Sequence, residues 1–169
     1  MVETISHGSF RHILSQFASG VTVVGVAGPR GPAGFTATGF MSASLVPPLV
    51  LVCIDKSASV YDAVVTAEAF GVSILEASQA WIAGRFAQSD IDRFEGVAFR
   101  LGQLTRAPLI EGALAQLECR RQALHDVGDH TLVVGEVAGG FSGAGRPLGY
   151  FARRFGTFTT EEPDGATRP

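Results

Sequence analysis

The sequence contains few charged residues for its size. They make up 17% of its 169 residues, hydrophobic residues make up 46%, and the formal net charge is -3. No run of basic residues is present, which disfavours nucleic acid as a partner. A surface so poor in charge indicates that another subunit covers part of it. We therefore expect the chain to associate with a second protein subunit.

Cysteine is also scarce. Cys53 and Cys119 are far apart in the sequence and match neither a metal-binding nor a redox spacing. We interpret them as reduced thiols of a cytoplasmic protein. No apolar segment approaches the roughly 20 residues that cross a bilayer, so we expect no membrane association. The N-terminus, MVETISHGSF, lacks the basic and apolar regions of a signal peptide.

Several catalytic and binding motifs are absent. No G-x-G-x-x-G follows the first predicted strand, which disfavours a Rossmann dinucleotide site. No G-x-S-x-G is present, which disfavours an α/β-hydrolase. His125 and His130, with two aspartates between them, have side chains that bind metals, but this composition is also typical of a turn. We predict no metal site.

The hydrophobic pattern predicts a mainly β protein. Phe10, Ile13, Leu14 and Phe17 have helical spacing, so residues 9–19 are predicted to form a helix that ends before Gly20. Strands are predicted at residues 21–26, 34–40, 49–54, 70–75, 97–101, 113–124 and 131–141, and residues 147–158 close the chain. The run at 49–54 is apolar on both faces, which indicates a central strand.

Two further helices are predicted between the strands, at residues 57–69 and 78–86, with Trp81, Ile82 and Phe86 facing the core. Residues 87–95 are polar and are predicted to be mobile, and residues 125–130 to form a turn. Strands in hairpin order with isolated helices between them favour an antiparallel β-barrel with helical insertions. Residues 1–158 are predicted to form one domain, and the polar tail 159–169 to be disordered.

One stretch, residues 34–62, has the composition of a binding site. Small hydroxyl residues are followed by an apolar strand, and then by Asp55, Lys56, Ser57 and Ser59. Ser57 is suited to cap a helix, whose free N–H groups and dipole favour an anion beside the Lys56 charge. This predicts the phosphate end of a flat cofactor such as a flavin, with the hydroxyl-rich strand under its ring. An ordinary capped helix explains the same residues.

The chain resembles the flavin reductase family, which supplies reduced flavin to two-component monooxygenases. The resemblance extends from Phe10 to Phe155 and rests on the combination of several segments. These are FASGVTVVG, GFTATGFMSASLVPPLVLVCIDKSAS, AGRFAQSDIDRFEGVAF, LECR, GDHTLVVGEV and RPLGYF.

The resemblance implies an FMN-binding split β-barrel of Greek-key type, a homodimer with flavin near the subunit interface, and NAD(P)H:flavin oxidoreductase activity. It implies FMN or FAD as cofactor, NADH or NADPH as hydride donor, and a separate monooxygenase as partner. His130 matches a histidine beside the nicotinamide site and is the implied catalytic residue. The implied cofactor-binding residues are Thr36, Ala37, Thr38, Ser42, Ser44, Cys53, Ile54, Asp55, Lys56, Ser57, Ser59, Arg85, Phe86, Ala87, His130, Tyr150 and Arg154.

The sequence leaves several functions open. A flavin-dependent oxidase or monooxygenase on the same barrel and a flavin-binding storage or redox-sensing protein are alternatives to the reductase. A lipid or small-ligand barrel would contain no flavin. Where the family often has Asn, Thr or Ser, this chain has Thr38, Ala58 and Val60. Fewer polar groups near the phosphate tail suit an enzyme that releases its flavin.

Overall fold

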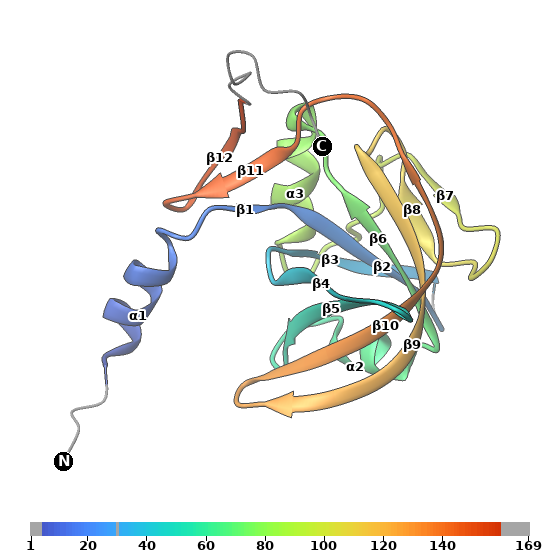
Figure 1. Ribbon diagram of the computed structural model, residues 1–169, viewed down its shortest axis with the longest axis horizontal. Helices are drawn as coiled ribbons and strands as arrows, with labels where there is room; N and C mark the ends of the chain where they lie inside the picture. The colour runs from blue at the N-terminus through green and yellow to red at the C-terminus, as the bar shows by residue number, and fades with distance from the viewer. Residues whose placement is uncertain (1–4, 30, 160–169) are drawn as a thin grey trace.

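The computed structural model describes residues 5–29 and 31–159 (Figure 1). The tail predicted to be disordered lies, beyond Thr159, outside the described residues. The three α-helices of the described part are α1 (His7–Leu14), α2 (Tyr61–Thr66) and α3 (Ala80–Phe86), and a 3-10 turn, η1 (Ala77–Gln79), precedes α3. No helix of this part is both long and apolar enough to cross a membrane.

A seven-stranded antiparallel sheet forms the body of the protein, with the order β3-β2-β6-β9-β10-β5-β4. Two small sheets, β1-β11-β12 and β7-β8, lie beside it. The strands of the large sheet are β2 (Thr22–Gly28), β3 (Gly31–Ala37), β4 (Phe40–Leu45), β5 (Pro48–Asp55), β6 (Ala69–Ile74), β9 (Ala115–Val127) and β10 (His130–Ser142). The small sheets contain β1 (Ser19–Gly20), β7 (Phe99–Leu101), β8 (Pro108–Ile110), β11 (Leu148–Phe151) and β12 (Arg154–Thr157).

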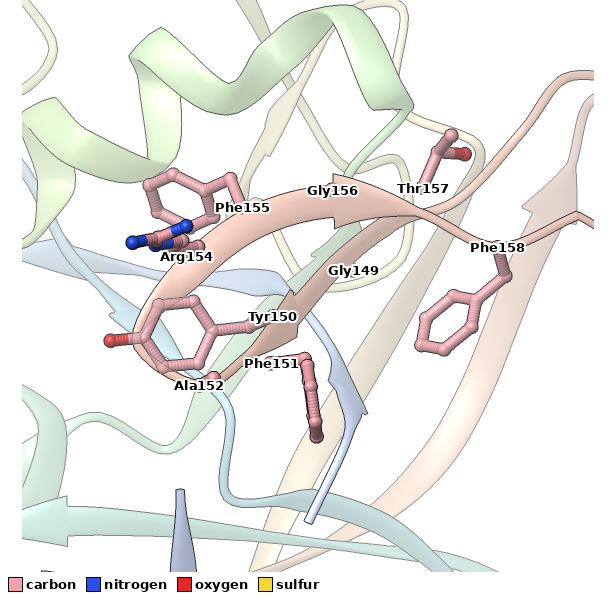
Figure 2. Close-up of a pocket in the computed structure, with 9 residues that line it drawn as sticks. All are labelled: Gly149, Tyr150, Phe151, Ala152, Arg154, Phe155, Gly156, Thr157 and Phe158. Carbon is pink, nitrogen blue, oxygen red and sulfur yellow. The ribbon is translucent and has the colours of Figure 1, made fainter. Parts of the chain in front are cut away.

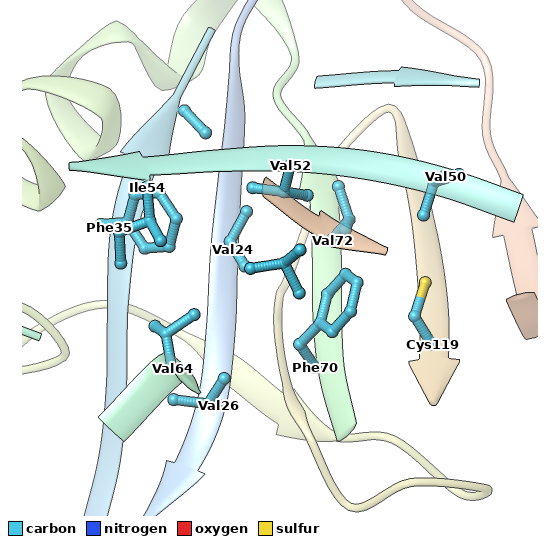
Figure 3. Close-up of a cluster of buried hydrophobic side chains, with 12 residues drawn as sticks. Val24, Val26, Phe35, Val50, Val52, Ile54, Val64, Phe70, Val72 and Cys119 are labelled. Atoms are coloured by element: carbon cyan, nitrogen blue, oxygen red, sulfur yellow. The ribbon is translucent and has the colours of Figure 1, made fainter. Parts of the chain in front are cut away.

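The main core lies inside the curve of the large sheet (Figure 3). Phe35 of β3 and Ile54 of β5 belong to the same buried cluster although four strands separate β3 from β5 in the strand order. A second cluster, which includes Val21, Phe86 and Leu148, packs under α3. The predicted mainly antiparallel β architecture is confirmed.

The strand predicted at residues 49–54 is not buried on both faces. In β5, Val50, Val52 and Ile54 point into the core, whereas Leu51 is half-buried and Cys53 is exposed. The reason is that the core cluster packs on only one face of β5, the face of Val50, Val52 and Ile54. The outer face of β5 is therefore free to line a site.

Two predicted helices differ from the structure. Helix α1 ends at Leu14, well before the predicted end near Gly20, and its apolar residues are exposed. In Figure 1 this helix projects away from the sheet. Trp81 is 57% exposed because the buried face of α3 is formed by Ile82, Ala83 and Phe86, and the side chain one position earlier points outward.

The turn predicted at residues 125–130 is shorter than expected. His125 is still within β9, and β10 begins at His130, so only Gly128 and Asp129 connect the two strands. Gly128 has a φ of 61°, a left-handed conformation that glycine adopts without strain. This tight hairpin fixes His130 opposite Asp55, its partner across the β5–β10 ladder.

Candidate functional site

A cleft of about 530 Å³ opens where β3, β5 and β10 meet the end of α3. It brings together most of the residues that the sequence predicted for the site. These are Thr36, Ala37, Thr38, Cys53, Ile54, Asp55, Ser57, Ser59, Phe86, Ala87 and His130. Phe35, Gly39, Ala58, Ser89 and Arg93 also line the cleft and were not predicted.

One wall of the cleft is the end of β3 and the two residues after it. The Thr36 hydroxyl donates a hydrogen bond to the Ala83 carbonyl at 2.7 Å, which ties β3 to α3. The Cys53 amide donates to the Gly39 carbonyl at 2.9 Å. A Cβ at position 39 would lie 3.2 Å from the Cβ of Cys53, so glycine permits this close approach. The wall is compact and neutral, and it suits a flat ring.

The Ser57 turn is built differently from the prediction. Both the amide and the hydroxyl of Ser57 donate to the Asp55 carboxylate at 2.7 Å, and these bonds lower the pKa of Asp55. Helix α2 begins only at Tyr61, after Val60, and has no side-chain cap. The prediction that Ser57 caps a helix is therefore wrong, and a helix dipole does not supply the expected anion site.

Lys56 is engaged outside the cleft. Its ammonium donates to the Gly128 carbonyl at 3.1 Å and lies 3.4 Å from the Asp126 carboxylate. Its backbone amide also bonds the hairpin turn, through the Asp129 carbonyl at 3.0 Å. In this geometry Lys56 fastens the end of β5 to the β9–β10 hairpin, and it does not line the cleft.

Arg93 supplies the positive charge instead. Its side chain is 9% exposed, and its guanidinium donates to the carbonyls of Gln88 at 2.6 Å and Gly34 at 2.8 Å and to the Ser59 hydroxyl at 3.0 Å. Among the described residues it forms no ion pair. Burial lowers the pKa of Arg93 and the nearby Asp90 opposes this, but a guanidinium stays protonated at neutral pH. A buried cation with neutral partners favours an anion beside it.

Arg93 could not be found from composition because it lies in the polar segment that was predicted to be mobile. The sequence feature that could have identified Arg93 is the segment Asp92-Arg93-Phe94 with Gly96 after it. This segment is part of the family resemblance. Arg85 gives this segment its shape by donating to the carbonyls of Asp92 at 2.7 Å and Arg93 at 3.1 Å. Arg85 itself does not line the cleft.

His130 lies where the cleft meets a second hollow. This hollow, of about 790 Å³, also borders on Cys53 and Asp55 and is closed on one side by His7, Phe10 and Arg11 of α1. The His130 Nδ1 is 2.7 Å from the Asp129 carboxylate, and this contact lowers the pKa of Asp129. Within residues 5–29 and 31–159 no group of three or more His, Cys, Asp or Glu side chains has a metal-binding arrangement.

Besides Lys56 and Arg85, four residues that the resemblance placed at the site lie outside the cleft. Ser42 and Ser44 are on the edge strand β4, and the Ser44 hydroxyl accepts from the Val46 amide at 3.2 Å. Tyr150 and Arg154 are on the closing hairpin β11–β12 and line a separate hollow of about 470 Å³ (Figure 2). The hairpin pairs with β1 and not with the large sheet, which separates these two residues from the cleft.

The comparisons with known proteins agree with this geometry. A protein-family model described as "Flavin reductase like domain" matches residues 14–159. The chain belongs to the flavin reductase family. The sequence-based prediction of this family is therefore confirmed.

Relatives of this flavin reductase-family protein have related names. It is 40% identical over 153 residues to "FMN reductase (NADH) SmoA" of Agrobacterium fabrum, covering 90% of this chain and 87% of the relative. It is 36% identical over 137 residues to "Flavin-dependent monooxygenase, reductase subunit HsaB" of Mycobacterium tuberculosis, covering 81% and 73%. The structure of the Streptomyces globisporus NADH:FAD oxidoreductase SgcE6, in complex with NAD and FAD fragments, has a TM-score of 0.86 and 38% identity, covering 98% and 100%.

Proposed function

We propose that the protein is an NAD(P)H:flavin oxidoreductase that supplies reduced flavin to a separate monooxygenase. The observation that carries the proposal is the buried Arg93 guanidinium in the lining of the cleft, bonded to Ser59, together with the neutral wall formed by the end of β3. One charged end and one neutral wall match a phosphorylated, flat heterocycle. The names of the relatives support the same reaction.

In the proposed complex, Arg93 and Ser59 hold the phosphate, and Ser57 only borders it because its amide and hydroxyl already donate to Asp55. Hydrogen bonds between charged groups contribute about 1.5–3 kcal/mol each, so two or three of them would provide much of a micromolar affinity. Thr36, Ala37 and Thr38, with the Cys53–Asp55 end of β5, lie along the ring. The Thr36 hydroxyl already donates to Ala83, so toward a ligand it can only accept.

A bound flavin supplies the hydride-accepting chemistry, and the protein supplies stacking and orientation. His130 stands at the junction of the cleft and the α1 hollow, so a nicotinamide that enters through the hollow would meet its ring. The Asp129 carboxylate holds the ring by its Nδ1 atom and leaves the Nε2 atom available. We propose that His130 contacts the nicotinamide and orients it.

We also propose that the enzyme is a homodimer and works in the cytoplasm. Helix α1 has no buried residue, and Phe10, Ile13 and Phe17 are each more than half exposed. Phe151 of the closing hairpin is 50% exposed. Such apolar surface is typical of a subunit interface. Light scattering during gel filtration would detect the dimer, and a monomer at micromolar concentration would contradict it. The free thiols of Cys53 and Cys119 suit a reducing compartment.

The reaction is tested by mixing the purified protein anaerobically with FMN or FAD and with NADH or NADPH, and following the visible absorbance of the flavin. The expected result is bleaching at a rate proportional to enzyme concentration. No bleaching with any combination would refute the reductase. A tightly bound flavin that NADH does not reduce would instead indicate a storage or sensing protein.

A further inference from the structure

A smaller hollow of about 260 Å³ adjoins the cleft and is not used by the proposed reaction. It lies between the start of β3, the residues before α2 and the segment that contains Arg93. It shares two residues with the cleft, Ser59 and Arg93. Its other lining residues are Pro32, Ala33, Gly34, Val60, Asp90, Ile91, Asp92 and Phe94.

The Arg93 side chain forms the boundary between the two spaces. One guanidinium nitrogen reaches the Gly34 carbonyl at 2.8 Å and another reaches the Ser59 hydroxyl at 3.0 Å. A phosphate held at this boundary from the cleft side has the smaller hollow on its other side. Any group attached beyond the phosphate would therefore enter that hollow.

The lining of the smaller hollow matches a nucleoside better than a second free anion. Pro32, Ala33, Val60 and Ile91 offer apolar contacts to a base. Asp90 and Asp92 contribute carboxylates, which repel a lone anion but accept hydrogen bonds from ribose hydroxyls, as acidic residues do in dinucleotide sites. The Asp92 carboxylate is held in place because the Phe94 amide donates to it at 3.0 Å.

We propose that this hollow, which we call the adenosine hollow, receives the adenosine half of FAD and makes the protein prefer FAD to FMN. The inference rests on the proposed flavin reductase function and names its flavin. The names of relatives do not decide the point, since one is an FMN reductase and another an NADH:FAD oxidoreductase. The volume suits half of a dinucleotide, because the pockets that hold whole drug-sized ligands measure about 300–1,000 Å³.

The test is to titrate the protein with FMN and with FAD separately and to follow the quenching of flavin fluorescence. We expect wild type to bind FAD about tenfold more tightly than FMN, which corresponds to about 1.4 kcal/mol. Ile91→Ala removes a contact at a 40% exposed side chain, so folding is not at risk. Ala33→Phe fills the hollow. Leu101→Ala is the control, because Leu101 is 42% exposed and lines neither space.

Ile91→Ala is expected to reduce the FAD preference about threefold and Ala33→Phe to abolish it, with FMN affinity within about twofold of wild type in both. Leu101→Ala should change neither affinity. Equal affinity of wild type for FMN and FAD would overturn the inference, as would an Ile91→Ala variant that keeps the full preference. Both results leave the reductase intact, whereas failure to bind either flavin would overturn the proposed function itself.

Discussion

Replacing Arg93 with lysine is the most direct test of the candidate site. Arg93→Lys keeps the positive charge but removes the planar group that reaches Gln88, Gly34 and Ser59 at once. A lysine ammonium is a point charge on a flexible stem and does not reproduce this geometry. We expect the variant to lose contact with the flavin phosphate and to loosen the Ser59 side of the cleft.

The magnitude follows from the number of bonds lost. A hydrogen bond that involves a charged group contributes about 1.5–3 kcal/mol, and each 1.4 kcal/mol is about tenfold in affinity. Loss of one such bond to the phosphate should weaken FMN binding about 10- to 100-fold. Riboflavin has no phosphate, so its affinity should change less than about threefold. The comparison separates phosphate binding from general damage to the cleft.

The matched control is Lys56→Met, which removes a charge that is near the site in sequence but bound to Gly128 and Asp126. Dissociation constants for FMN and riboflavin are measured by fluorescence quenching for wild type and both variants. Lys56→Met should bind FMN within about twofold of wild type. The reasoning is refuted if Lys56→Met weakens FMN binding as much as Arg93→Lys, or if Arg93→Lys weakens riboflavin and FMN equally.

Three other predictions concern catalysis and stability. His130→Ala should slow hydride transfer at least tenfold in stopped-flow reduction while FMN affinity changes less than about threefold, and an unchanged rate would remove its role. Glu118 is nearly buried; burial raises its pKa, but bonds from the Thr105, Leu104 and Gln103 amides outweigh this, so its pKa lies below the ordinary 4.5. The ionised Glu118 therefore stabilises the fold fully above pH 4.5, and this stabilisation is lost as the pH falls through the lowered pKa. Glu118→Gln should lower the free energy of unfolding, measured by urea titration, by about 1–3 kcal/mol near neutral pH. The difference between variant and wild type should be smaller below about pH 4. Gly135→Ala should destabilise by about 1–3 kcal/mol, because a Cβ there overlaps the Phe70 ring; a wild-type melting temperature would show that the core adapts.

Much of the fold was predictable because strands and hairpins leave local signals. Alternating apolar and polar residues identified β9, and the polar run at residues 125–130 identified the turn before β10, although the turn is shorter than expected. Burial was harder to predict, since it depends on neighbours in the fold. Trp81 and the apolar residues of α1 have helical spacing but are exposed in the described part of the chain.

The cleft was predicted well where its residues are consecutive in the sequence and poorly where they come together only in the fold. Thr36–Thr38 and Cys53–Asp55 are strand ends whose neighbours in sequence are also neighbours in space. Arg93 takes the role that the sequence suggested for Lys56. The hairpin turn offers Lys56 a nearer partner, and Arg93 reaches the cleft from a loop 34 residues after Ser59. Tertiary hydrogen bonds of this kind have no local sequence signal.

The two cysteines differ in reactivity, so the wild-type protein carries a single thiol that reports on the cleft. Burial, with the Glu118 charge as a smaller contribution, raises the pKa of Cys119 to about 12, so that thiol is inert at neutral pH. Cys53 is exposed on the wall of the cleft. An alkylating reagent should therefore label a single position, at a rate that falls as a ligand covers it. Occupancy of the cleft can be followed by mass spectrometry on the wild-type protein, without any variant.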